Sequence, residues 1–168
     1  TGIDAALHLR DVHGLRTEDV ERVRVRAGKI TQIQCGWPFE PAPPARMIFH
    51  LGYAMAVALK RGKVLPSDFE GEALRDPELV RLARATVVEE DETLTAIYHE
   101  KKPCDVAFYL RDGQCLHTRV EYCRGDPENR PSEEDVLAKF LGLTEERLGR
   151  SRAERLADFI LSVDRQPG

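Results

Sequence analysis

The sequence predicts an α+β domain in which a small, mostly antiparallel sheet packs against helices. Apolar residues at helical spacing occur near both ends of the chain and in its middle, and segments with alternating apolar residues lie between them. The chain contains no internal repeat and no low-complexity tract. Strands that sit between helices in this way favour a sheet with helices packed against it.

The chain opens with a short helix and a strand. Residues 3–12 place apolar side chains at helical spacing, and Gly14 follows where a glycine that ends a helix would stand. The next segment is broadly period-two and is interrupted at residues 27–29; its apolar members are Val23, Val25, Ile30 and Ile33. We expect the first strand here, as a single strand or as a hairpin.

A proline-rich loop leads into the most apolar helix. Residues 37–44 contain four of the ten prolines, and each proline fixes φ and removes a backbone donor, so this segment is predicted to be a stiff loop. Residues 49–59 are apolar on nearly every side when drawn as a helix. A helix without a polar face is expected to be buried.

Two short amphipathic helices and a strand are predicted next. Ser67 is placed to cap the first helix, with Glu70 at its third position, and Pro77 stands at the favoured first position of the second. Thr86–Val88 then read as a short strand. The acidic run Glu89–Glu92 reads as a solvated loop that follows this strand.

A hairpin and two helices complete the predicted elements. Residues 106–110 and 115–120 alternate on either side of Asp112-Gly113, a pair that favours a type I′ turn. Residues 132–135 resemble a capping box for a helix through Phe140. A last helix is expected from about Ser151 to Val163, with one apolar face made of Leu156, Phe159, Ile160 and Val163.

Length and composition limit the possible functions. With 168 residues, 42% of them hydrophobic, residues 1–168 are expected to form one compact unit. The net charge of −4, with both signs interspersed, leaves no basic stripe for a nucleic acid. We see no signal peptide and no run near the roughly 20 apolar residues that cross a bilayer. The chain starts at Thr1 directly in a helical pattern, which indicates a cut in a longer protein.

The cysteines and histidines predict no metal site and no disulfide framework. The four cysteines show no CxxC spacing, which favours reduced thiols in a cytoplasmic protein. Zinc sites need close pairs of Cys or His ligands, and His99 with Cys104 is too loose a pair. We assign no role to the scattered histidines His8, His13, His99 and His117.

Tyr53 and His50 are the polar residues that stand out in the apolar helix. No nucleophile elbow, phosphate loop or metalloprotease helix is present elsewhere in the chain. The pattern alone favours Tyr53 as a core tyrosine whose hydroxyl bonds a carbonyl. Its small neighbours Gly52 and Ala54 would also let a substrate or another backbone approach closely. His50 stands three residues earlier, on the same face, so the two side chains can share one pocket.

Two arginines are weaker candidates for binding an anion. Arg46 precedes the apolar helix and has the geometry to clamp a carboxylate, although an exposed loop arginine is the simpler interpretation. Arg124 opens the segment 124–129, whose Gly, Asp and Asn are accounted for by turn formation. Spacing alone supports no function for Arg124.

Five blocks of sequence in a fixed order resemble the C-terminal part of the MmgE/PrpD family. The blocks are IDAALHLRDVHGLRTEDVERVRV, FHLGYAMAVALKRGKV, DFEGEALRDPELVRLA, LRDG and RGDPENRPSEEDVLAKF. The family includes 2-methylcitrate dehydratase, cis-aconitate decarboxylase and iminodisuccinate epimerase. The resemblance covers nearly the whole chain, and five ordered blocks are more specific than any single motif.

The resemblance implies a two-domain homodimeric enzyme, with a helical domain first and a smaller α+β lid second. This chain would be the lid, and the helical domain would be absent from it. Such enzymes mostly use no metal or organic cofactor. They remove a proton next to a carboxylate and then expel water or carbon dioxide, or return the proton.

The resemblance also implies roles for particular residues. The family tyrosine that holds or protonates the substrate falls on Tyr53, and the family's catalytic histidine falls just before Thr1. Many relatives have Ser and Pro where this chain has His50 and Gly52, and often Lys where it has Ile48. These departures bear on the identity of the substrate and leave the fold prediction unchanged.

Three functions therefore remain open from the sequence. The first is the C-terminal domain of a cofactor-independent lyase or isomerase for a small polycarboxylic acid, with Tyr53 as catalytic residue and His50, Arg46 and Arg124 in binding. In that case the missing domain supplies further cationic groups, and a lid without its partner exposes apolar surface. The second is a free-standing module for ligand binding or dimerisation without catalysis. The third is a degenerate relative that is retained for interaction.

Overall fold

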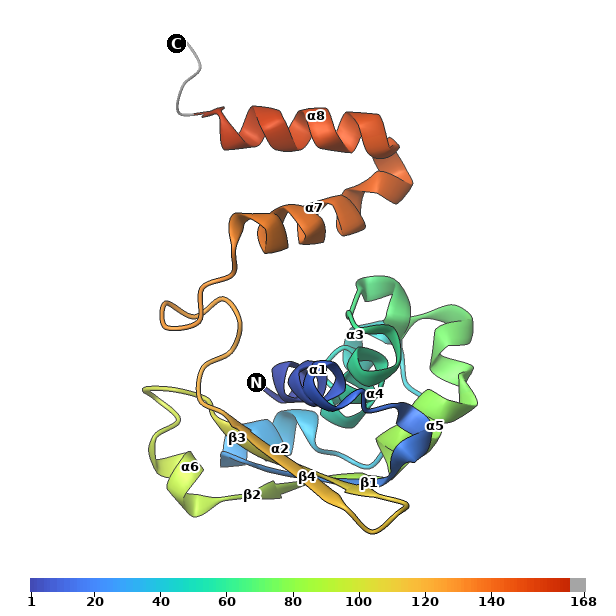
Figure 1. The fold of residues 1–168 in the computed structure, drawn as a ribbon, viewed down its shortest axis with the longest axis vertical. Helices are drawn as coiled ribbons and strands as arrows, with labels where there is room; N and C mark the ends of the chain where they lie inside the picture. The colour runs from blue at the N-terminus through green and yellow to red at the C-terminus, as the bar shows by residue number, and fades with distance from the viewer. Residues whose placement is uncertain (164–168) are drawn as a thin grey trace. The chain divides into compact units, whose positions relative to one another are not determined.

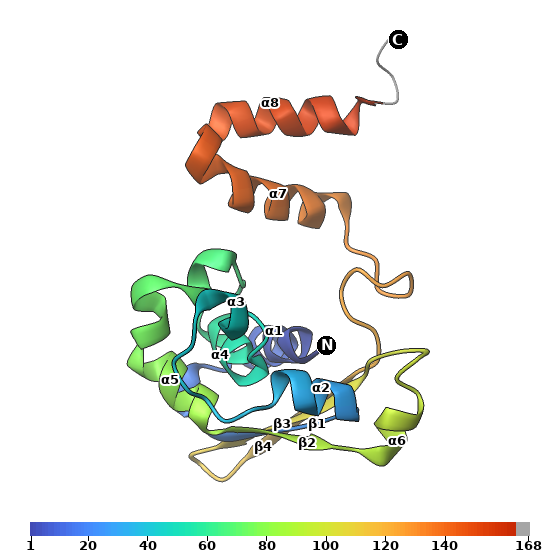
Figure 2. The ribbon, with the colours of Figure 1, turned by 180° about the vertical axis from the view of Figure 1, so that it is seen from behind.

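A computed structural model describes residues 1–163 of the chain (Figures 1 and 2). Its contacts divide the chain into two compact units, residues 1–128 and the part that begins at Asn129. This is a finer division than the one compact unit expected from the length. None of the helices in the described part combines the length and the apolar character that a membrane crossing requires.

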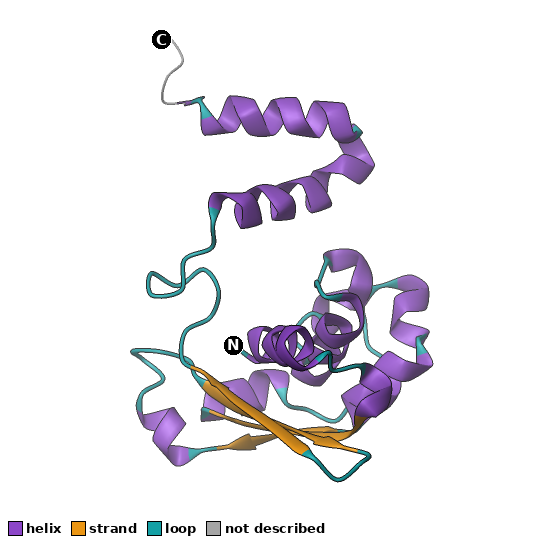
Figure 3. Ribbon diagram, in the orientation of Figure 1, coloured by secondary structure: helices purple, strands orange, loops and turns teal. Residues whose placement is uncertain are grey.

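The first unit is a mixed sheet with helices packed on one side of it (Figure 3). The strands are β1 (Val20–Ala27), β2 (Thr86–Glu90), β3 (Cys104–Leu110) and β4 (Cys115–Val120), in the order β2-β1-β3-β4. The helices are α1 (Gly2–His13), α2 (Lys29–Cys35), α3 (Pro44–Met47), α4 (Leu51–Arg61), α5 (Pro77–Arg84) and α6 (Glu92–Ala96). Short 3-10 turns lie at Thr17–Asp19, Pro66–Phe69 and Gly71–Arg75. β3 pairs antiparallel with β1 and β4, and β2 is parallel to β1, so the α+β class is confirmed.

One face of the sheet forms half of the core. From Val23 to Ala27 the buried side chains of β1 alternate with exposed ones, which gives this part of the strand a period of two, and a register shift separates it from the buried Val20. The pairing register places Val25 opposite Val106 on one side and Val88 on the other. It also places Phe108 opposite Val23. The buried residues of neighbouring strands therefore share one face, which packs under the helices.

The apolar helix α4 is buried, as its sequence predicted. All residues from Gly52 to Leu59 are buried. α1 packs beside α4 and runs parallel to it, because Gly2 lies against Leu51 near both starts and Gly62 lies against Arg10 near both ends. A Cβ atom on Gly2 would come within 2.8 Å of the Leu51 side chain, so the glycine permits this close approach. The N-termini of the two helices therefore lie at the same end of the unit.

The structure corrects the predicted strand that followed Val25. β1 ends at Ala27, and Ile30 and Ile33 belong to α2, where their side chains are exposed. Two residues that are three positions apart share a face in a helix and point to opposite faces in a strand. The spacing of these isoleucines was therefore helical, and the prediction of a strand or hairpin over them was wrong.

The cap predicted at Ser67 is also wrong. The turn Pro66–Phe69 is a 3-10 helix, and the carboxylate of Asp68 accepts the hydrogen bond of the Leu65 N–H over 2.7 Å. The turn ends at Phe69, so Glu70 lies outside it. The Asp68 carboxylate reaches back to the residue before the turn, as the third residue of a capping box does.

The acidic run and the hairpin turn differ in detail from their predictions. Glu89 and Glu90 complete β2, and the buried Asp91 caps α6 by accepting the N–H groups of its first turn, so the run is not a solvated loop. The hairpin of β3 and β4 is confirmed, but only Gly113 in its turn has a positive φ, of 88°. The Leu110 N–H donates to the Gln114 carbonyl, which encloses a three-residue loop rather than a type I′ turn.

The second unit is a pair of helices, α7 (Glu133–Leu148) and α8 (Arg150–Leu161). Ser132 and Asp135 form the predicted capping box, and α7 continues past Phe140 to Leu148. The side chains of Ala153 and Ala157 are buried in this unit. Large apolar side chains remain exposed on it: Val136, Leu143, Leu148, Leu156, Phe159, Ile160, Leu161 and Val163. Of the predicted apolar face, Leu156, Phe159 and Ile160 lie on α8 with exposed side chains, whereas Val163 follows the end of the helix at Leu161.

Candidate functional site

His50 is the N-cap residue of α4. Its backbone is extended, with φ −76° and ψ 101°, and its Nδ1 accepts a hydrogen bond from the Tyr53 backbone N–H over 3.0 Å. The imidazole therefore does what the oxygen of a capping serine or asparagine does at other helix starts. The residue is 2% exposed, and this burial lowers the pKa of His50 below its usual value.

The hydroxyl of Tyr53 points into the core. It lies 2.9 Å from the Asp68 carbonyl oxygen and 2.6 Å from the Ala73 carbonyl oxygen, and its proton is donated to these acceptors. Burial raises the pKa of Tyr53 to about 12, so the hydroxyl keeps its proton at neutral pH. The side chain thus ties α4 to the two 3-10 turns that follow it. Any role in catalysis requires these turns to release the hydroxyl.

Gly52 explains how the start of α4 packs so closely. A Cβ atom at this position would lie 2.9 Å from the Thr86 Cβ and 3.1 Å from the Ala83 carbonyl oxygen. The small residues beside Tyr53 were expected to admit either a substrate or another backbone. At Gly52 the structure shows another backbone, that of Ala83. This contact joins the start of α4 to the junction of α5 and β2.

Aromatic rings and cations surround the capping histidine. The rings of Trp37 and Phe39 each lie 5.3 Å from the His50 ring, both edge to face. The guanidinium of Arg46, in α3, lies 5.2 Å from the centre of the Trp37 ring, and Arg46 is exposed. The structure therefore brings Arg46, His50 and Tyr53 to one end of α4. The sequence analysis did not single out Trp37, although it is the only tryptophan in the chain.

Arg124 lies on a different segment, after β4. Its backbone N–H donates to the Asp4 carboxylate over 3.2 Å, which holds this segment against the first turn of α1. Because α1 and α4 are parallel, the starts of both helices lie at one end of the unit. Arg124 is thereby linked to that end through α1, whereas the other three predicted residues belong to α4 or precede it.

Two helix N-termini at one end favour an anion there. Each helix carries roughly half a positive charge at its N-terminus, from backbone N–H groups without partners in the helix. Asp4 already occupies the first turn of α1, so α4, with a neutral cap, is the less compensated of the two. Arg46 adds a full positive charge directly before α4, and the backbone of Arg124 lies against the first turn of α1. The arrangement is suited to a ligand with more than one carboxylate.

Exposed apolar residues lie beside these helix ends. Ile48 is 50% exposed and Phe49 is 55% exposed, directly before the cap of α4. Large apolar side chains next to a charged region are typical of a surface that another protein segment covers. This end of the first unit therefore has positively charged groups that can bind an anion and exposed apolar side chains that can contact another protein segment.

Two of the four thiols, those of Cys104 and Cys123, lie in surroundings that disfavour the reactive thiolate. Burial raises the pKa of Cys104, and burial together with the nearby Asp126 carboxylate raises the pKa of Cys123. Both thiols therefore stay protonated near neutral pH, whereas nucleophilic cysteines have a lowered pKa. Within residues 1–163, no group of His, Cys, Asp and Glu side chains is arranged to hold a metal ion.

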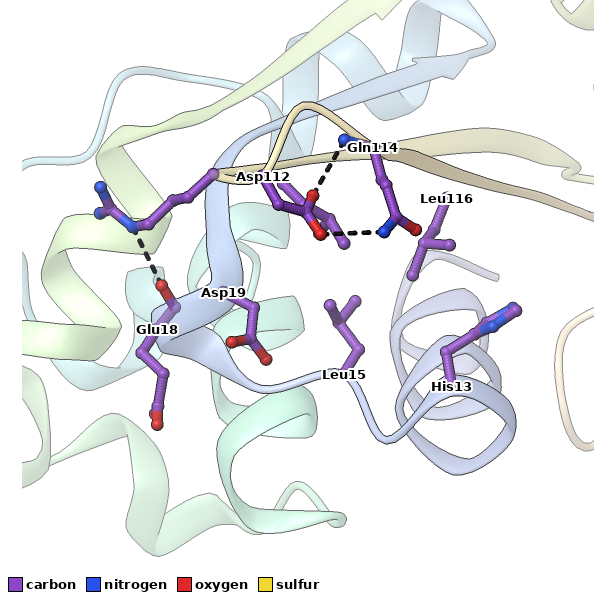
Figure 4. Close-up of a pocket in the computed structure, with 9 residues that line it drawn as sticks. His13, Leu15, Glu18, Asp19, Asp112, Gln114 and Leu116 are labelled. Atoms are coloured by element: carbon purple, nitrogen blue, oxygen red, sulfur yellow. Dashed lines mark hydrogen bonds between the residues drawn. The ribbon is translucent and has the colours of Figure 1, made fainter.

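A surface pocket of about 420 Å³ lies at the other end of α1 (Figure 4). His13 lines it, together with the turn between β3 and β4. Its polar groups bond one another, because the Asp112 carboxylate accepts from the Gln114 backbone and side chain, and Arg111 donates to the Glu18 carbonyl. None of the four predicted site residues lines this pocket. We therefore place the candidate site at the starts of α1 and α4.

Comparison with known proteins agrees with the resemblance seen in the sequence. A search of curated proteins found no match to the chain. The family model described as the MmgE/PrpD C-terminal domain matches residues 1–165, which is nearly the whole chain. The chain therefore belongs to the MmgE/PrpD family, as a C-terminal domain.

Proposed function

We propose that this domain forms one wall of the active site of a lyase or isomerase that acts on a small polycarboxylic acid. The other wall is a helical domain of the same protein, and the enzyme works as a homodimer without a cofactor, as the family resemblance implies. The main support within this chain is the pair of parallel N-termini of α1 and α4, with Arg46 directly before α4 and the Arg124 backbone bonded to the first turn of α1. The wall that carries them faces the substrate.

The proposed chemistry divides the work between the two walls. A base from the helical domain removes a proton next to a carboxylate, and the electron pair left behind spreads onto the carboxylate oxygens. Positive groups that are fixed before the reaction stabilise this charge. Arg46 and Arg124 serve here as carboxylate-binding residues, and the N-terminus of α4 adds its dipole.

The exposed apolar residues support a second domain as the partner. Ile48 and Phe49 are half-exposed directly before α4, and α7 and α8 carry seven more exposed apolar side chains. A pair of helices can bury only part of its apolar surface between them, so the stable arrangement sets the rest against another element. The helical domain is the occupant that we propose for both surfaces.

Tyr53 has a less direct place in this proposal. Its hydroxyl donates to buried carbonyls and keeps its proton, so it is not a base near neutral pH. We keep Tyr53 as the proposed catalytic residue on the condition that the Asp68–Ala73 segment moves and releases the hydroxyl. His50 contributes by fixing the start of α4 and not by direct contact, because its ring is buried.

Turnover by the gene product that carries this domain tests the proposal. We expect it to convert at least one of 2-methylcitrate, cis-aconitate and iminodisuccinate. Arg46→Ala and Arg124→Ala should each lower kcat/KM about 10-fold or more, the factor for losing a hydrogen bond between charged groups. The control is Arg16→Ala, since Arg16 follows the opposite end of α1. An enzyme that converts none of the three acids, or equal losses in the control, contradicts the proposal.

A further inference from the structure

We propose that His50 makes the start of α4 sensitive to pH, because its ring caps the helix only while Nδ1 is unprotonated. The proposal rests on the geometry of the cap and is independent of the proposed function. At acid pH the loop that begins at Trp37 is released from the start of α4.

The cap requires one particular form of the ring. Nδ1 accepts the Tyr53 N–H over 3.0 Å, and a ring nitrogen accepts a hydrogen bond only when it carries no proton. The single proton of the neutral ring is therefore on Nε2. Nε2 is buried without a hydrogen-bond partner, although the Trp37 carbonyl lies near enough to act on the ring. A second proton at Nδ1 would turn the acceptor into a donor that faces the Tyr53 N–H.

Backbone groups of Trp37 and His50 favour a charged ring, but the burial of the ring outweighs them, so the pKa of His50 is lowered. Trp37 and Phe39 enclose it edge to face, and the groups that act on its pKa include no carboxylate. Two cations lie over the enclosing rings, Arg46 over Trp37 and Arg84 over Phe39 at 5.9 Å, and the nearest carboxylate along the chain, that of Glu40, is exposed. The helix dipole also places its positive end against the ring. Protonation therefore removes the cap and adds an unfavourable charge at the same point.

The direction of the pH dependence follows from these facts. The buried ring has a lowered pKa in the folded state, so below about 6.5 the unfolded chain binds a proton that the folded chain does not. The contribution of His50 to stability is thus complete above that pH. It declines as the pH falls from about 6.5 through the pKa of the folded state.

The experiment uses Trp37, the only tryptophan, as a reporter beside the ring. Tryptophan emission and Tm are measured between pH 5 and pH 8 on the whole chain of wild type, His50→Asn and His99→Asn. Asparagine is a good cap that does not titrate, and His99 is an exposed histidine for comparison. Between neutral pH and acid, wild type and His99→Asn should lose about 2–4 °C more in Tm than His50→Asn. Their emission should also change below about pH 6.5, and that of His50→Asn should not.

Coincident pH profiles of wild type and His50→Asn would overturn the proposal. Should His50→Asn fail to fold, NMR of the wild-type imidazole decides the question. At neutral pH we expect the proton on Nε2, and the Tyr53 amide signal should shift as the ring titrates. A proton on Nδ1 at neutral pH, or titration without a shift of that amide, contradicts the proposal.

Discussion

Replacement of Phe108 by Ala should lower the free energy of unfolding by about 3–5 kcal/mol, the range for a large aromatic side chain lost from a core. Phe108 is fully buried in β3, and its ring lies opposite Val23 and Leu116 on the covered face of the sheet. These neighbours belong to the strands on either side, so they cannot close the cavity without moving the sheet. Chemical denaturation of the whole chain measures the change.

Tyr109→Ala is the matched control, because Tyr109 is the next residue of the same strand. Its ring points to the other face, where the Arg22 guanidinium lies 3.5 Å from the ring centre. We expect this variant to lose at most about 1 kcal/mol, the usual range for a cation–π contact at an exposed site. Equal losses in the two variants would contradict the arrangement of the sheet with one covered face.

Tyr53→Phe should lower the free energy of unfolding by about 1–3 kcal/mol, because the buried Asp68 carbonyl loses this donor and the Ala73 carbonyl keeps only the Asp76 N–H. The Asp68 and Ala73 carbonyls accept from the hydroxyl, and a phenylalanine ring would fill the same space without supplying a proton. Urea denaturation is again the measurement. Tyr98→Phe is the control, because Tyr98 is only half-buried and a surface change costs about 0.5 kcal/mol or less.

The same variant separates the two roles of Tyr53. If the tyrosine is structural alone, kcat of the enzyme that carries this domain is unchanged at a temperature where Tyr53→Phe is folded. A loss of kcat under that condition supports the proposed catalytic role. Equal stability losses in Tyr53→Phe and Tyr98→Phe would contradict the hydrogen bonds described for the hydroxyl.

The sequence predicted elements whose signals are local. The buried α4, the capping box of α7, the first-turn Pro77 of α5 and the β3–β4 hairpin all follow from residues that are close in the chain. Misassignments arose where two interpretations share a pattern. Ile30 and Ile33 follow the alternating residues Val23 and Val25 closely, so they were assigned to the same strand. The Asp-Gly pair is compatible with both a two-residue and a three-residue hairpin turn.

The candidate site was only partly accessible to such reasoning. The pattern favoured a tyrosine bonded to a carbonyl, but the acceptors of Tyr53 lie 15 and 20 residues away. His50 was paired with Tyr53 by helix geometry, yet its role as a cap depends on the extended backbone at that residue. The parallel arrangement of α1 and α4 is a tertiary feature. In the sequence, the small residues Gly2 and Gly62 are the features connected with this parallel packing, because each allows a close contact between the two helices.

An NMR titration of the ¹⁵N-labelled chain with citrate tests the central claim most directly, namely that the starts of α1 and α4 form a carboxylate-binding wall. We expect saturable shifts at the amides of Ile3, Leu51 and Gly52, with a Kd of about 1 mM, because half of the site is elsewhere. Shifts centred on the pocket beside His13, or no shifts at millimolar citrate, would contradict the claim. A Kd of about 1 μM would contradict it too, because a complete site in this chain means a free-standing binding module.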